Sequence, residues 1–163
     1  MIEIRKAKAR DLTRVLSIEA ESFGRDAWDR PIFVRALEES PHLFLVARSV
    51  KRRKRSLTLA ARQRLPSRPV VGYSITYVER GAGELVSIAV APLYRGKGVG
   101  EALVRFTIGE LSKRGIDVMR LVVRVDNDGA LAFYKRLGFV RIRRVKGYYG
   151  RGQDGWRMEK AGS

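Results

Sequence analysis

The sequence predicts an α/β (α+β) domain, in which a mixed sheet of about seven strands is flanked by about four helices. Three observations carry this prediction. Strand-like and helix-like hydrophobic periods alternate along the chain, turn and breaker residues separate them, and a glycine-rich turn from Arg95 to Gly100 joins a strand pattern to a helix pattern. At 163 residues, a single domain at 1–163 is expected to bury most of its apolar surface.

Each expected element is bounded by a capping, turn or breaker residue. Asp11 is a helix N-cap, Pro31 opens a second helix along a face with Ile32, Phe33, Ala36 and Leu37, and Ser40-Pro41 ends it. Gly81-Ala82-Gly83 forms a turn. Gly115 is the C-terminal cap of the helix expected at 99–113. The expected segments are strands at 2–6, 43–47, 70–78, 84–91, 119–125, 139–144 and about 155–160, and helices at 12–22, 31–39, 99–113 and 128–137.

Charge is the unusual feature of the composition. The formal net charge is +17, with a pI near 11.0, which favours nucleic acid, ribosome or a polyanionic cofactor as partner. Eight basic residues and no acidic one lie between Lys51 and Pro69. The basic excursion at about 50–69 therefore accounts for much of the positive net charge. Like charges this close repel one another and resist burial.

Composition also excludes several kinds of site. The chain has no cysteine and a single histidine, His42, so thiolate and His-rich metal sites are excluded and no metal is expected. No run approaches the roughly 18 apolar residues of a membrane span, and no signal-peptide core is present. A cytoplasmic location without membrane contact is therefore the expectation.

The turn from Arg95 to Gly100 has the features of an anion site. Glycines let main-chain N–H groups approach an anion, and the N-terminus of the following helix carries partial positive charge. Arg95 and Lys97 add formal charge. The spacing matches neither the Rossmann fingerprint nor a Walker A loop. A diphosphate cradle is predicted, with an ordinary strand-to-helix turn as the alternative.

Two motifs together indicate a family. Arg-x-x-Gly-x-Gly at Arg95 to Gly100, after Ile88-Ala89-Val90, resembles the pyrophosphate-binding motif of the GNAT superfamily of N-acetyltransferases. The segment from Asn127 to Phe139 is similar to the family signature Asn-x-x-Ala-x-x-x-Tyr-x-x-x-Gly-Phe. The resemblance covers nearly the whole chain apart from residues 51–69. It implies the GNAT fold, with a mostly antiparallel mixed sheet, and an enzyme that uses acetyl-CoA.

A third segment narrows the branch. Tyr148 to Gly155 resembles the Tyr-Tyr-x-x-Gly-Glu-Asp-Ala stretch of RimI-like and NatA-type N-terminal protein acetyltransferases, with Gln153 for Glu and Gly155 for Ala. This implies acetyl transfer to the α-amine of protein N-termini, ribosomal or nascent, by direct attack in a ternary complex. Two alternatives stay open: an acetyltransferase for lysine side chains, polyamines or another small amine, and a nucleic-acid-binding module on a degenerate acetyltransferase fold.

The resemblance also implies the cofactor contacts. Ile88, Ala89 and Val90 would present main-chain groups to the pantetheine arm, with the Val90 N–H facing the thioester oxygen, in a slot between the strands at 84–91 and 119–125. The pyrophosphate would be held by Arg95, Gly96, Lys97, Gly98, Val99 and Gly100. Asn127, Ala130 and Tyr134 complete the cofactor set, although Asn127 could equally cap a helix.

Acid and base are assigned separately. Tyr134 is the expected general acid, because a phenol with a pKa near 10 carries a proton at neutral pH. The alternative is a packing tyrosine on its helix. RimI-like enzymes carry a catalytic glutamate where this chain has Val122. The NatA-type histidine and the histone-acetyltransferase glutamate correspond to Glu84, which is therefore the expected base, directly or through water. A solvated residue at a strand start is the alternative.

Acceptor and partner assignments rest on position. Phe23 and Asp26 lie between the first two helices, where the family contacts its acceptor, and Tyr148 and Tyr149 could close over a peptide. The expected substrate is a protein N-terminus. The basic segment from Lys51 to Arg68 could contact the ribosome or RNA through phosphates, or be a solvated loop. A monomer or weak homodimer is expected.

Overall fold

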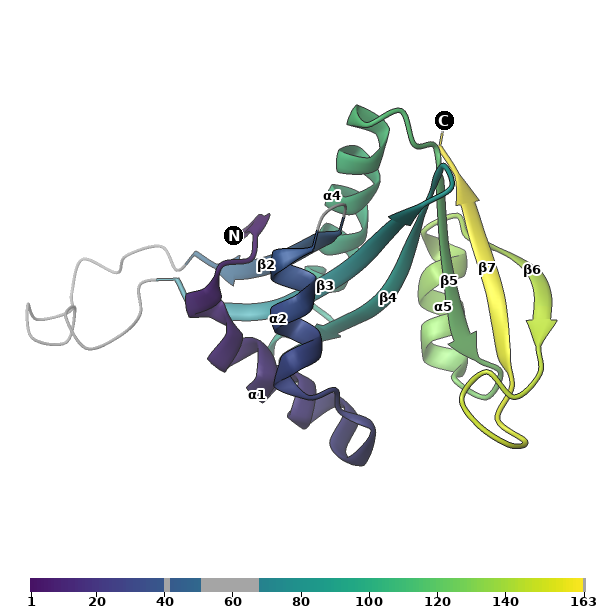
Figure 1. Cartoon of the computed structure of the whole chain (residues 1–163), viewed down its shortest axis with the longest axis horizontal. Coiled ribbons are helices and arrows are strands. Elements are labelled where there is room, and N and C mark those ends of the chain that lie inside the picture. The colour runs from purple at the N-terminus through teal and green to yellow at the C-terminus, as the bar shows by residue number, and fades with distance from the viewer. Residues whose placement is uncertain (40–41, 51–67, 163) are drawn as a thin grey trace, which may run out of the picture. The chain divides into compact units, whose positions relative to one another are not determined.

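The computed structural model of the chain describes residues 1–39, 42–50 and 68–162. The strands are β1 (Ile2–Lys6), β2 (Leu43–Ser49), β3 (Val70–Glu79), β4 (Ala82–Val90), β5 (Val118–Arg124), β6 (Val140–Val145) and β7 (Gly155–Ala161). The helices are α1 (Leu12–Phe23), α2 (Arg30–Glu38), α4 (Val99–Lys113) and α5 (Asp128–Arg136). Figure 1 shows these elements along the chain. Their order is the predicted one.

The strands form one mixed sheet. They are hydrogen-bonded in the order β1-β2-β3-β4-β5-β7-β6. β4 and β5 run parallel, whereas β1 with β2, β5 with β7 and β6 with β7 run antiparallel. Parallel neighbours need a crossover, and α4 lies between β4 and β5 in the sequence. The predicted α/β class with a mixed, mostly antiparallel sheet is confirmed.

The chain forms two compact units, whose boundaries pass through β3, β4 and α4. The first unit combines Met1–Ile75 with Ile88–Val104, and the second combines Thr76–Ser87 with Arg105–Ser163. The predicted end of α2 at Ser40-Pro41 and most of the basic excursion, residues 51–67, lie outside the described residues. A single domain over the whole chain stays a prediction.

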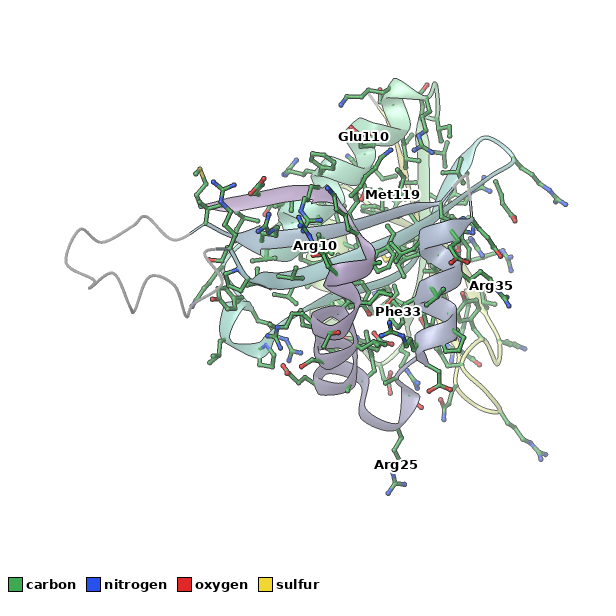
Figure 2. All side chains as sticks on the ribbon, turned by 60° about the vertical axis from the view of Figure 1, so that its left-hand side comes forward. Arg10, Arg25, Phe33, Arg35, Glu110 and Met119 are labelled. Carbon is green, nitrogen blue, oxygen red and sulfur yellow. The ribbon has the colours of Figure 1, made fainter. Side chains whose placement is uncertain are left out.

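Two groups of buried side chains hold the first unit together. Leu45, Ala47, Val71, Val99 and Leu103 form an apolar cluster in which no residue is more than 1% exposed. Phe33 of α2 packs edge-on against Tyr73 of β3, with ring centroids 5.6 Å apart. In Figure 2, Phe33 points inward from α2, whereas Arg25 extends away from the preceding connection. Ile32 is exposed, so the apolar face of α2 is narrower than predicted.

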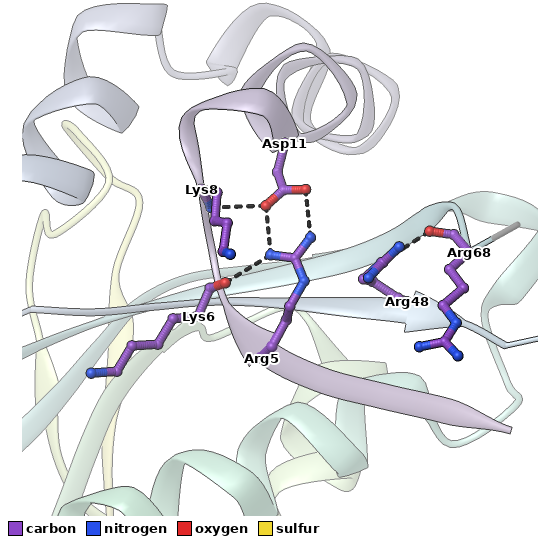
Figure 3. Close-up of polar contacts among 6 residues, drawn as sticks. All are labelled: Arg5, Lys6, Lys8, Asp11, Arg48 and Arg68. Carbon is purple, nitrogen blue, oxygen red and sulfur yellow. Dashed lines mark hydrogen bonds and ion pairs between the residues drawn. The ribbon is translucent and has the colours of Figure 1, made fainter. Parts of the chain in front are cut away.

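Asp11 has a different role from the predicted helix cap. Its carboxylate accepts two hydrogen bonds of 2.8 Å from the Arg5 guanidinium and one of 2.8 Å from the Lys8 N–H (Figure 3). It makes no side-chain cap on α1. The correction has a physical reason: Arg5, at the end of β1, offers a bidentate charged partner that the carboxylate binds more strongly than the neutral N–H groups at the start of α1. The pair ties β1 to the start of α1.

Replacing Asp11 with asparagine should lower the free energy of unfolding by about 2 kcal/mol at neutral pH, because charged hydrogen bonds are lost. Burial by itself would raise the pKa of Asp11, but the bonds from Arg5 and Lys8 outweigh it and the pKa is lowered. A lowered folded-state pKa stabilises the protein above the unfolded-state pKa of about 4, and this contribution disappears as the pH falls through the folded-state value.

Urea unfolding checks this prediction. The curves of the wild type and Asp11→Asn should be separate at neutral pH and should converge at strongly acidic pH. Asp29→Asn is the matched control, because the exposed Asp29 makes no side-chain cap on α2. If the wild type and Asp11→Asn differed equally in stability at both pH values, the lowered pKa of Asp11 would not be the source of the stabilisation.

The second unit contains the first part of β4, β5, β6, β7, α5 and the C-terminal part of α4. Burial alternates along β5, where Met119, Leu121 and Val123 are buried and the residues between them are half-buried. β3 turns into β4 through Arg80 and Gly81, with φ values of 47° and 77°. Ala82 and Gly83, predicted in the turn, therefore belong to β4. Gly115 ends α4 with a φ of 72°, as predicted.

Candidate functional site

The glycine-rich turn lies between β4 and α4 in the first unit. Gly96 and Gly98 have φ values of 69° and 79°, and a Cβ at either position would meet no atom within 4 Å. Val99, the first residue of α4, is buried in the apolar cluster and anchors the helix start. Because the first N–H groups of a helix have no intrahelical acceptor, this open turn can bind an anion.

Two cations brace the turn. The Nε of Arg95 donates to the Val90 carbonyl at 2.9 Å, and its guanidinium also donates to the Ser22 hydroxyl at 3.1 Å. The Nζ of Lys97 donates to the Leu93 carbonyl at 2.8 Å. Both charges are thus held beside the turn by backbone carbonyl groups. Their contact with a pyrophosphate stays a prediction.

The C-terminal end of β4 is positioned by close backbone packing. Ala91 donates its N–H to the Val71 carbonyl at 2.8 Å, immediately after Ile88-Ala89-Val90. A Cβ on Gly72 would lie 3.0 Å from the Ala89 carbonyl oxygen, so glycine lets β3 approach β4 closely. Sequence reasoning missed Gly72, although a glycine inside a strand pattern signals such an approach.

Glu84 lies in β4, in the second unit, within a row of charges. Its two carboxylate oxygens accept hydrogen bonds from Nη1 of Arg157, at 3.2 and 3.0 Å. Arg120, opposite Glu84 on β5, forms an ion pair of 2.9 Å with Glu159 of β7. The Glu84 side chain is 28% exposed and is held by an ion pair, which favours a fixed orientation over a freely solvated side chain. Sequence reasoning missed Arg157, which lies far away in the chain and becomes a neighbour only through the strand register.

Tyr134 lies inside an aromatic group of the second unit. It is 6% exposed, and its ring lies edge-on to Phe133 and Phe139, with centroids 5.0 and 5.5 Å away. Burial raises the pKa of Tyr134 above its ordinary value, and Tyr149 raises it further. The ring thus packs within this group, and the phenol carries its proton at neutral pH. A role as general acid stays a prediction that this protonation state permits.

Tyr148 and Tyr149 stand beside this group. The Tyr149 hydroxyl donates to the Val122 carbonyl at 2.8 Å, and Arg124 lies 4.6 Å from its ring centroid. Burial raises the pKa of Tyr149 to about 12. Tyr148 is 48% exposed, and burial together with the charge of Glu84 raises its pKa. Pairwise electrostatic interactions in the second unit thus link Tyr134 to Tyr149, Tyr149 to Tyr148, and Tyr148 to Glu84.

The departures from the expected motifs are neighbours in the structure. A Cβ on Gly155 would lie 2.3 Å from Cγ1 of Val122 and 3.3 Å from the Tyr149 ring. Gln153 accepts a hydrogen bond of 2.8 Å from Arg124. Valine at position 122 thus occupies the space that an alanine side chain at position 155 would need. Glycine at position 155 thus leaves this space to Val122, and the motifs by themselves could not reveal the contact.

Asn127 caps α5. Its side-chain oxygen accepts a hydrogen bond of 3.1 Å from the N–H of Ala130. The capping interpretation is confirmed for this asparagine, and a contact of Asn127 or Ala130 with the cofactor stays a prediction. The cap fixes where α5 begins, and hence where Tyr134 lies, two turns further along the same helix.

The predicted acceptor residues of the first unit lie on the connection between α1 and α2. Phe23 is 41% exposed at the end of α1, and Asp26 is exposed in the short 3-10 helix that follows. Glu19, which is 2% exposed, accepts a hydrogen bond of 2.8 Å from the Trp28 N–H and another from the Tyr73 hydroxyl. Glu19 therefore anchors the connection between α1 and α2 to the buried side of α1. Sequence reasoning missed it because a glutamate within an amphipathic helix normally faces solvent.

Two further findings concern only the part of the chain that the structure describes. None of its helices has the length and hydrophobicity that crossing a membrane requires. It also holds no group of three or more histidine, cysteine, aspartate or glutamate side chains that could bind a metal ion.

Comparison with known proteins supplies the family. The model of the acetyltransferase (GNAT) family matches residues 12–139. N-alpha-acetyltransferase RimI of Mycobacterium tuberculosis is 32% identical over 152 residues, covering 92% of this chain and 86% of that protein. Other curated relatives give shorter matches: the aligned segment spans 55% of N-alpha-acetyltransferase 30 of Schizosaccharomyces pombe, so the chain spans about half the length of such relatives.

Solved structures agree on the fold. The crystal structure of the ribosomal-protein-S18-alanine N-acetyltransferase from Escherichia coli has a TM-score of 0.77 at 26% identity, covering 100% of this chain and 95% of that one. Arabidopsis thaliana NAA60 in complex with acetyl-CoA has a TM-score of 0.79 at 17% identity, with coverage of 99% and 98%. Since the family model spans most of the sequence, with both motifs inside it or at its edge, the chain belongs to the acetyltransferase (GNAT) family.

Proposed function

We propose that this protein is an acetyl-CoA-dependent N-acetyltransferase that modifies the N-terminal α-amine of proteins. The observation that carries the proposal is the nearly full-length similarity to an N-alpha-acetyltransferase, RimI of M. tuberculosis. The likeness to the E. coli enzyme for ribosomal protein S18 supports the same acceptor class. A protein α-amine has a pKa of about 7.7–8.0, against about 10.4 for lysine, so a modest base can deprotonate it.

Acetyl-CoA fits the residues of the first unit. The left-handed glycines at positions 96 and 98 leave open space at the N-terminus of a 15-residue helix, beside two cations. Main-chain N–H groups from Gly96 to Gly100 would bind the pyrophosphate, and Ile88 to Val90 would bind the pantetheine arm. When bound, acetyl-CoA supplies the acetyl thioester. The Val90 N–H would stabilise the negative charge that develops on its oxygen.

The second unit would supply the proton transfers. Glu84 would remove a proton from the acceptor amine, directly or through a water, while Arg157 holds its carboxylate in place. Tyr134 would donate a proton to the departing thiolate, because burial raises its pKa and keeps the phenol protonated. Phe23, Asp26, Tyr148 and Tyr149 would contact the acceptor peptide, since Phe23 and Tyr148 expose aromatic surface.

Cellular context follows from the acceptor. The proposed substrate is a ribosomal or nascent protein, which places the enzyme in the cytoplasm as a monomer or weak homodimer. The basic segment from Lys51 to Arg68 would contact ribosomal RNA through phosphates, and its binding would weaken steeply with salt. Only Arg68 of this segment is described, and there it forms an ion pair with Glu3.

Replacing Glu84 with glutamine should lower the turnover of a peptide with a free N-terminus by about 100-fold, because the amide cannot accept the proton. Glu159→Gln is the matched control: it removes the other glutamate of the same row, whose partner is Arg120. This control should keep turnover within about threefold of the wild type, because the Arg120–Glu159 ion pair has no proposed role in the chemistry. Similar losses in both variants would reject Glu84 as the base.

Acceptor class is tested with two peptides. One has a free N-terminus and no lysine, and the other has a blocked N-terminus and an internal lysine. Acetyl transfer to the first peptide alone supports the proposed function. Transfer to the second alone assigns the enzyme to lysine side chains, and no transfer to either peptide rejects acetylation of proteins.

A further inference from the structure

The outer edge of the sheet in the second unit is open. β6 ends the strand order and pairs with β7, its single partner among the described strands (Figure 1). The backbone N–H and C=O groups on its other side are therefore available to another extended chain. A bulge between Arg141 and Arg143 interrupts the ladder with β7.

β6 also exposes apolar side chains. Val140 is 59% exposed and Ile142 is 50% exposed, although both are strand-forming residues that proteins commonly bury. Beside them is an open cleft of about 530 Å³ between α5 and the strands β6 and β7. Its apolar wall comes from Leu131, Phe139 and Met158. An edge with a neighbouring apolar cleft can bind a peptide through its backbone and select one of its side chains.

The cleft is separate from the proposed catalytic residues. On α5 it is lined by Asp128, Leu131, Ala132 and Lys135, whereas Asn127, Ala130 and Tyr134 occupy another face of the helix. A ligand in the cleft would contact Phe139, whose ring packs against Tyr134, but it would not contact Tyr134 itself. This separation makes the cleft a second surface and not an extension of the acetyl-transfer site.

Charge determines which peptide fits. β6 carries Arg141, Arg143 and Arg144 within six residues, and Lys135 stands at the cleft. Arg144 is neutralised by Asp154, and Arg141 lies on the Trp156 ring at 5.1 Å. Among the described residues, Arg143 and Lys135 have no acidic partner. Two cations without ion pairs exceed the one carboxylate that lines the cleft, Asp128, and this positive surplus favours carboxylates in a partner.

We propose that the β6 edge and its cleft bind an extended acidic segment of a partner protein, which adds as a further strand and places an apolar side chain in the cleft. An extended polypeptide can satisfy the free backbone groups of the edge. Single-stranded nucleic acid is less suited, because its bases stack on exposed aromatic rings and Trp156 is covered by Arg141. The competing explanation is that the arginines and the bulge only protect the edge from aggregation.

A labelled peptide of alternating glutamate and valine, blocked at both ends so that it cannot be acetylated, tests the proposal on the full chain. Fluorescence anisotropy should show saturable binding that weakens with salt. The same composition with a central proline should bind about tenfold more weakly or worse, since proline cannot pair within a sheet. Replacing the glutamates with lysines should abolish binding.

A double variant, Ile142→Glu with Arg143→Glu, places polar residues at two exposed positions of β6, so the fold should be kept. It removes an apolar contact and reverses a charge, and should weaken peptide binding about tenfold or more. Its acetylation of a peptide with a free N-terminus should stay unchanged, which separates this proposal from the proposed function. Hydrogen exchange should slow at β6 amides when the peptide is added to the wild type. Tighter binding of single-stranded RNA of equal length, a dimer that the double variant dissolves, or peptide binding unaffected by the variant would each overturn the proposal.

Discussion

Replacing Tyr134 with phenylalanine is expected to lower the turnover of acetyl transfer by about 100-fold or more, while the affinity for acetyl-CoA changes little. The change removes one hydroxyl from a side chain that is 6% exposed and packed between Phe133 and Phe139. The aromatic packing is kept, so the fold should be kept. What is lost is the hydroxyl proton, which burial keeps on the phenol at neutral pH and which would pass to the departing thiolate.

Steady-state kinetics and calorimetric titration of acetyl-CoA measure the two quantities separately. Tyr77→Phe is the matched control, because it removes the hydroxyl of another tyrosine of the second unit that has no proposed role in the chemistry. It should retain nearly full turnover. A Tyr134→Phe enzyme that turns over like the wild type would leave Tyr134 as a packing residue only.

Replacing Glu19 with alanine is expected to lower the free energy of unfolding by about 3 kcal/mol. The carboxylate is buried and accepts hydrogen bonds from the Trp28 N–H and the Tyr73 hydroxyl. Its removal takes an acceptor away from the buried Tyr73 hydroxyl and from the partly buried Trp28 N–H. Each lost bond costs about 1–3 kcal/mol, partly offset because the desolvated charge is also removed. Tyr73→Phe removes one hydrogen bond and keeps the ring, so it should cost about 1 kcal/mol.

Urea unfolding of the two variants measures these losses. Glu21→Ala is the control from the same helix, because Glu21 contacts Arg14 and Ser17 at the surface and should change stability by less than about 0.5 kcal/mol. A loss for Glu19→Ala no larger than that of the control would remove the proposed anchor. The ring contact of Trp28 with Phe33 would then be the stronger support for the connection between α1 and α2.

The conformation of the glycine-rich turn was predictable because it depends on neighbouring residues only. Glycine is the residue that adopts left-handed backbone conformations without strain, and a helix start exposes N–H groups wherever it occurs. Gly96 and Gly98 have the required φ values, and Val99 begins α4 as the pattern predicts. Asp11 shows the limit of local reasoning. Its position before a helix predicts a cap, but Arg5 is a stronger partner from the preceding strand.

The sequence by itself determined the order of the elements, the open glycine-rich turn before α4 and the place of Tyr134 within α5, because periodicity, glycine geometry and helix caps depend on neighbouring residues. The tertiary structure decided which side chains meet across strands. Arg157 joins Glu84, and Gly155 makes room for Val122, through the register of β5 and β7. A shift of one residue in register turns every side chain to the opposite face, and no local pattern specifies that choice.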